Sequence, residues 1–136
     1  MRILKLLFIF SIISVLIACS IEPEPINFGS DHCIYCKMTI SDPKYGAELV
    51  TDKGRIYKFD AIECMIPYLK ENPKTEFSYI MVIAYDEPKK LKKVEGLHFV
   101  KNEHFKSPMG KNLAAFANQP KEFESLDWKK LKKSFN

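Results

Sequence analysis

Two cysteines and a methionine lie within six positions in the run Cys33-Ile34-Tyr35-Cys36-Lys37-Met38. Thiolate and thioether sulfur are soft ligands, and together they suit Cu(I) better than they suit hard cations. The Cys-x-x-Cys spacing is also that of thiol redox centres, in which a helix N-terminus activates the first cysteine. The motif therefore indicates either soft-metal binding or thiol-disulfide chemistry.

The residues that follow the motif favour the metal. The run Ser41-Asp42-Pro43 comes soon after Met38, and the residue before a proline is biased away from the helical region. The motif is therefore predicted to lie on a loop and not at the start of a helix, which argues against a thioredoxin-like site. A loop also offers the exposure that metal exchange with a partner requires. A membrane-tethered thiol-disulfide oxidoreductase remains the alternative.

The sequence contains four cysteines. Cys19 directly follows a predicted N-terminal signal peptide, described below, and is expected to carry lipid. The remaining three, Cys33, Cys36 and Cys64, cannot all pair within one chain. One thiol stays free, pairs between chains or binds a ligand, and a disulfide between any two of the three stays open. The sequence has no second Cys-x-x-Cys to complete a four-thiolate zinc site, although a zinc-stabilised module is a further alternative. Covalent c-type haem attachment needs a histidine directly after the second cysteine. Lys37 occupies that position, so a c-type haem is not expected.

Residues 1–18 have the features of a lipoprotein signal peptide. Arg2 and Lys5 precede an almost unbroken apolar run over 6–17, which is too short for a comfortable membrane span. The ending Leu-Ile-Ala-Cys resembles a bacterial lipobox, so cleavage after Ala18 and lipidation of Cys19 are expected. An ordinary signal peptide cut nearby is the alternative. We predict a lipoprotein anchored in a membrane and facing the periplasm or the cell exterior.

The mature chain is predicted to hold a tether and one small domain. Removal of the leader leaves 118 of the 136 residues and lowers the formal net charge from +4 to +2, because Arg2 and Lys5 are lost. This near-balance argues against nucleic acid as a partner. Residues 19–30 contain few large apolar side chains and two prolines, which predicts an extended tether behind the lipidated cysteine. Residues 31–136 are long enough for a single core.

A β-β-α-β order is predicted for the first module, residues 31–86. Short apolar and alternating segments predict a hairpin with strands over 45–50 and 55–59, joined by a turn at Gly54. A dense apolar run over 77–85 predicts a buried strand. The predicted helix lies between the hairpin and this third strand, so the elements are expected to form one compact unit.

The predicted helix covers 61–70 and carries Cys64 in its first turn. Asp60 is expected to cap its N-terminus, and Pro67 predicts a kink or an early end. Met65 falls on the apolar face and is predicted to lie in the core, whereas Cys64 is either a ligand or a small buried hydrophobe.

The second half of the domain carries weaker signals. The charged stretch 86–95 contains Pro88 and is predicted to be a boundary. Strands are expected over 97–100 and 113–117. A basic tail follows, in which Trp128 and Leu131 are the expected packing anchors.

Four features in chain order resemble the NosL family. They are the lipobox Cys19, the motif Cys33-x-x-Cys36-x-Met38, the aromatic-Asp-x-x-x-Cys-Met stretch that ends at Cys64 and Met65, and the turn Ser107-Pro108-Met109-Gly110. The resemblance implies an α+β fold of two small β-β-α-β-like modules of the NosL/MerB-like kind, over 31–86 and 87–136. The chain is short after Ala117, so the second module is expected to be incomplete or to end in a helix around Trp128.

The resemblance also implies a function. It identifies the chain as an extracytoplasmic Cu(I)-binding lipoprotein that acts as a copper chaperone and not as an enzyme. The partners it implies are the membrane through the lipid anchor, nitrous oxide reductase and the maturation transporter of that enzyme. The candidate metal ligands are all sulfur atoms, from Cys33, Cys36, Met38, Met109 and Cys64.

Overall fold

The computed structural model describes residue 1 and residues 20–135. The predicted signal peptide over 1–18 and the predicted lipidation at Cys19 lie outside the described residues, apart from Met1. Among the residues described, no helix is both long and apolar enough to cross a membrane.

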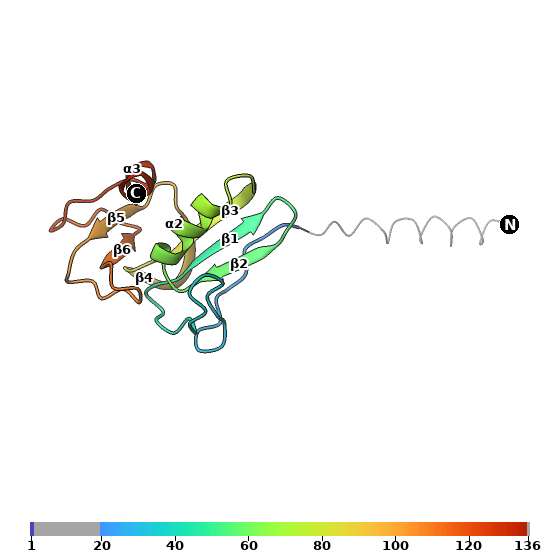
Figure 1. Ribbon diagram of the computed structural model, residues 1–136, viewed down its shortest axis with the longest axis horizontal. Helices are drawn as coiled ribbons and strands as arrows, with labels where there is room; N and C mark the ends of the chain where they lie inside the picture. The colour runs from blue at the N-terminus through green and yellow to red at the C-terminus, as the bar shows by residue number, and fades with distance from the viewer. Residues whose placement is uncertain (2–19, 136) are drawn as a thin grey trace.

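A four-stranded antiparallel sheet with the order β2-β1-β3-β4 forms the first layer (Figure 1). Its strands are β1 (Ala47–Thr51), β2 (Ile56–Phe59), β3 (Phe77–Ala84) and β4 (Glu87–Lys93). The predicted hairpin is present, with Val50 paired to Ile56. Gly54 has a φ of 79°, the left-handed conformation that a glycine adopts without steric cost.

The strand β4 corrects the prediction that 86–95 is a boundary. It pairs with β3 along the sheet edge, with Met81 opposite Lys93 and Val82 opposite Lys92. An edge strand exposes one side to solvent and tolerates lysine and proline, as Pro88 shows. The charged composition therefore reflects the edge position and not a break in the fold.

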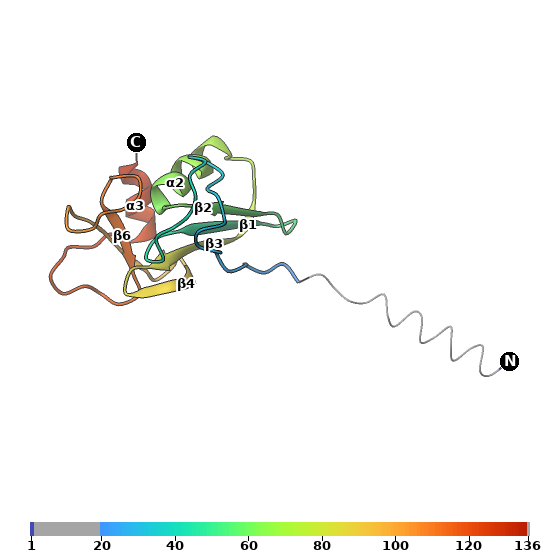
Figure 2. The ribbon, with the colours of Figure 1, turned by 90° about the horizontal axis from the view of Figure 1, so that it is seen from below.

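The helix α2 (Ile62–Glu71) packs on one face of the sheet (Figure 2). Met65 is fully buried there, as predicted. The helix continues past Pro67 to Glu71, so of the two effects predicted for Pro67, a kink or an early end, the early end does not occur. The predicted cap is also wrong, because the N-cap is Ala61 and no side chain caps the helix. Asp60 is instead buried beside the thiols described below.

The second module is smaller than the first. It consists of a two-stranded antiparallel sheet, β5 (His98–Lys101) and β6 (Leu113–Phe116), followed by α3 (Trp128–Ser134). The Trp128 ring lies 5.7 Å from the Phe99 ring, and Leu131 is buried. Both predicted anchors therefore pack, and α3 is the last element described, so no strands corresponding to β3 and β4 follow it among residues 20–135.

One hydrophobic cluster joins the two modules. It includes Phe59 and Met65 from the first module and Phe99, Leu113 and Leu131 from the second. A further link is the hydrogen bond from the Tyr85 N–H to the Ala115 carbonyl. The α+β fold is therefore one domain with a shared core.

The segment predicted as an extended tether is packed on the domain from Glu24 onward. The Glu24 N–H donates to the buried Glu48 carboxylate at 2.9 Å, and Ile26 is buried. Lys58 of β2 donates to the Pro25 carbonyl at 3.0 Å and to Asp31 at 2.8 Å. Isolated apolar residues among prolines gave no periodic signal, which is why this packing was not predicted.

Candidate metal centre

The Cys-x-x-Cys motif lies on a tight hydrogen-bonded loop, as predicted. The Cys33 N–H donates to the Met38 carbonyl at 2.8 Å, and the Lys37 N–H donates to the Cys33 carbonyl at 3.0 Å. Lys37 takes a φ of 66°, which closes the loop. The loop is attached to β2, because the Ile34 N–H donates to the Lys58 carbonyl at 2.9 Å. The backbone around the first cysteine is thus held in place from two sides.

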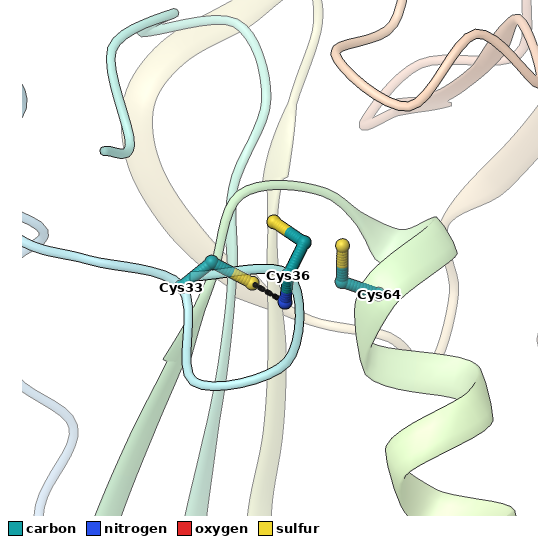
Figure 3. A group of neighbouring side chains, drawn as sticks. All are labelled: Cys33, Cys36 and Cys64. Carbon is teal, nitrogen blue, oxygen red and sulfur yellow. Dashed lines mark hydrogen bonds between the residues drawn. The ribbon is translucent and has the colours of Figure 1, made fainter. Parts of the chain in front are cut away.

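Three cysteine side chains converge beside this loop. The Sγ atoms of Cys33, Cys36 and Cys64 all lie within 4.8 Å of one another (Figure 3), and all three are free thiols. Cys64 reaches the group from the first turn of α2. Three thiolates bound at about 2.3 Å to one ion lie about 4 Å apart, so small side-chain movements would let the group close on a metal.

The three thiols differ in acidity. A hydrogen bond from the Cys64 thiol lowers the pKa of Cys33 to about 5, and the Cys36 N–H adds a donor at 3.4 Å from the Cys33 sulfur. The same hydrogen bond and burial raise the pKa of Cys64, and burial raises the pKa of Cys36. Cys33 is therefore the most acidic of the three thiols, and loading the other two sulfurs as thiolates releases protons.

A buried carboxyl group adjoins the thiols. Asp60 is 2% exposed, and burial followed by the nearby Cys33 charge raises its pKa to about 6. Its backbone N–H also helps to stabilise the Cys33 thiolate. Sequence reasoning placed Asp60 at a helix cap. Its position four residues before Cys64 was the signal that could have placed it at the site.

The two candidate methionines are exposed and come from different loops. Met38 is 51% exposed on the cysteine loop, and Met109 is 39% exposed on the loop between β5 and β6. Neither fills the core, which was the alternative role considered for Met38. The structure thus brings Cys33, Cys36 and Cys64 together, and leaves the two thioethers at the surface.

A family model for NosL matches residues 25–124. The chain belongs to the NosL family. The matched range covers both sheets and the three cysteines, and it ends before α3, so the terminal helix lies outside the part that the family model describes.

A solved NosL structure has the same fold. The chain is similar to the crystal structure of the copper chaperone NosL from Shewanella denitrificans, with a TM-score of 0.65 and 14% sequence identity over 81% of this chain and 95% of that one. No curated protein sequence matches the chain. The predicted family and the predicted α+β fold are therefore confirmed.

Proposed function

We propose that this NosL-family protein carries Cu(I) outside the cytoplasm as a chaperone and not as an enzyme. The observation that supports this most is the group of three free cysteines whose sulfurs lie within 4.8 Å of one another. The name of the similar structure from Shewanella denitrificans, a copper chaperone, agrees with this proposal. Copper is cargo in this proposal, so the site has to bind it and also give it up.

The donor set favours Cu(I) over zinc. Structural zinc sites take four ligands from cysteine and histidine. Among the described residues, the group contains three cysteines and no histidine or carboxylate. Thiolate and thioether donors select Cu(I), and we propose that Met38 and Met109 supply thioethers to the same ion. Exposed thioethers are suited to exchange, because they can leave the ion as a partner's ligands enter.

Delivery is proposed to occur at a membrane. The lipobox-like leader predicts a lipid anchor at Cys19, and we propose that the anchored protein serves the copper centres of nitrous oxide reductase, with the maturation transporter of that enzyme as a partner. The family assignment supports this choice of partners. Cys33 and Cys64 are buried whereas Cys36 is only partly buried, so we propose that a partner's ligands approach from the Cys36 side.

Thiol-disulfide exchange is the second candidate function. The low pKa of Cys33 favours it, because the thiolate is the attacking form. However, Cys33 is only 1% exposed, and an attacking thiol has to reach the disulfide of another protein. The more exposed Cys36 has the raised pKa. The acidic thiol, Cys33, is therefore inaccessible, and the more accessible thiol, Cys36, is less acidic, which argues against thiol-disulfide exchange.

The test is an anaerobic Cu(I) titration of the reduced protein from Ser20 onward against a competing chelator. Cys33→Ser, Cys64→Ser, Met38→Leu and Met109→Leu are compared with the unsubstituted chain. We expect tight one-to-one binding that is weakened by both cysteine and methionine changes. Binding of Zn(II) in preference to Cu(I), or no competitive binding of Cu(I), would contradict the proposal.

A further inference from the structure

A buried glutamate precedes the third cysteine. Glu63 is 4% exposed and lies in the first turn of α2, directly before Cys64. Its Oε1 atom accepts a hydrogen bond from the Ser107 hydroxyl at 2.6 Å and a second from the Leu113 N–H at 3.2 Å. Both donors belong to the second module. The helix that carries a candidate ligand is thus bonded directly to the loop between β5 and β6.

Ser107 also organises the loop that contains Met109. Its hydroxyl oxygen accepts from the Asn112 N–H at 2.9 Å, and its carbonyl accepts from the Gly110 N–H at 3.0 Å. Gly110 takes a φ of 73°, which lets the chain turn back immediately after Met109. The methionine is therefore held at the tip of a turn whose base is Ser107.

The glutamate is a poor choice if its role is only to stabilise the fold. Its Oε2 atom is buried, and within the described part of the chain it has no hydrogen-bond partner. A buried polar atom without a partner opposes folding, and an apolar side chain of similar size would avoid that cost. What the carboxylate supplies is a fixed geometry, because Oε1 accepts one donor from the loop, the Ser107 hydroxyl, and one from the first residue of β6, the Leu113 N–H.

We propose that Glu63 and Ser107 form a positioning pair that holds the Met109 turn against the helix that carries Cys64. Its purpose is to present a thioether from the second module to the ion that the three thiols of the first module bind. The inference deepens the proposed function and rests on it. Glu63 and Ser107 are positioning residues in this arrangement, since they act through Met109 and Cys64 and not on the metal itself.

A double-mutant cycle with Cu(I) affinity as the readout tests the pair. Loss of groups that orient metal ligands lowers affinity by about 10- to 100-fold, so Ser107→Ala is expected to weaken Cu(I) binding at least tenfold. Met109→Leu in the Ser107→Ala background should then weaken it by much less than in the unsubstituted chain. Glu63→Gln keeps an acceptor oxygen, so Met109→Leu should still weaken Cu(I) binding in that background. Glu63→Ala has no acceptor, so Met109→Leu should have little effect on Cu(I) affinity there. Ser125→Ala, which removes an exposed hydroxyl paired with Gln119, is the matched control.

Three outcomes would overturn the inference. The first is additive effects of Ser107→Ala and Met109→Leu, which would show that the pair supports the fold without positioning the methionine. The second is Cu(I) binding that Met109→Leu leaves unchanged while Cys33→Ser abolishes it, which would remove Met109 from the ligand set but leave the three-thiol site and its proposed role as a Cu(I) carrier standing. The third applies if Ser107→Ala unfolds the apo protein: equal effects of Met109→Leu in the Glu63→Gln and Glu63→Ala chains would then contradict it.

Discussion

The acidity of Cys33 is predicted to depend on Cys64. The Cys64 thiol is the main donor to the Cys33 sulfur, so Cys64→Ala should return the pKa of Cys33 from about 5 towards or above the ordinary 9.0, because burial then opposes ionisation. At pH 7 a thiol with a pKa of about 5 is about 99% thiolate, and one with a pKa of about 9 is about 1% thiolate. The substitution should therefore remove nearly one thiolate per chain at neutral pH.

The assay counts thiolates by their ultraviolet absorbance under anaerobic, metal-free conditions. The chain from Ser20 onward contains three cysteines, and the rise in absorbance from pH 3 to pH 7, a range in which tyrosine side chains stay un-ionised, is divided by the concentration of chain. We expect one thiolate in the unsubstituted chain and almost none in Cys64→Ala. Cys36→Ala is the matched control, because it keeps both the Cys64 thiol and the backbone N–H that donates to Cys33. Cys36→Ala should retain one thiolate.

The reasoning would be refuted if Cys64→Ala kept one thiolate at pH 7, or if Cys36→Ala had as little thiolate as is expected for Cys64→Ala. The first result would mean that backbone donors alone hold the charge. The second would mean that the thiolate is shared differently among the three sulfurs. In either case the order in which protons leave on metal binding would have to be reassigned.

Three further predictions concern stability and binding. Burial raises the pKa of Glu48 to about 7, so above pH 4.5 the unfolded chain loses a proton that the folded chain retains, and stability falls as pH rises to 7. In urea unfolding, the free energy of unfolding of Glu48→Gln should therefore be about 3 kcal/mol larger than that of the unsubstituted protein at pH 8, and only slightly larger at pH 4.5. An equal difference at both pH values would contradict this. Met38→Leu should weaken Cu(I) binding at least tenfold, or by about 1.4 kcal/mol. The urea midpoint of unfolding should not change, because Met38 is 51% exposed. A shifted midpoint with unchanged affinity would instead show that Met38 contributes to packing. Leu131→Ala should cost about 2–5 kcal/mol of unfolding free energy, since Leu131 is 2% exposed, and a loss below about 1 kcal/mol would show that α3 is not part of the core.

The first module could be predicted because its signals are local. The turn at Gly54 and the apolar spacing around Met65 each depend on neighbouring residues, and the structure has the hairpin and the helix at those places. The loop placement of the Cys33 motif followed from the nearby proline in the same way. Short-range rules of this kind fix the type of an element but not its partners.

The missed features depend on contacts between distant residues. The strand β4 is highly charged because it lies at a sheet edge, and only its pairing with β3 identifies it. The burial of Asp60 beside Cys33 depends on the path of the cysteine loop, which no local pattern encodes. From the sequence, Cys64 was either a ligand or a small buried hydrophobe, and only the fold shows that its sulfur lies within 4.8 Å of the other two.

The packed N-terminal segment limits where the protein can work. Because the Glu24 backbone is fixed to Glu48, only residues 20–23 separate the domain from the expected lipid on Cys19, and four residues span at most about 14 Å. With the proposed lipid on Cys19, so short a linker would hold the domain in a thin layer above the bilayer. Its search for an acceptor is then essentially two-dimensional, which raises the local concentration of any partner in the same membrane. Under the proposed function, copper would then pass from this protein to its acceptor without entering the bulk solution.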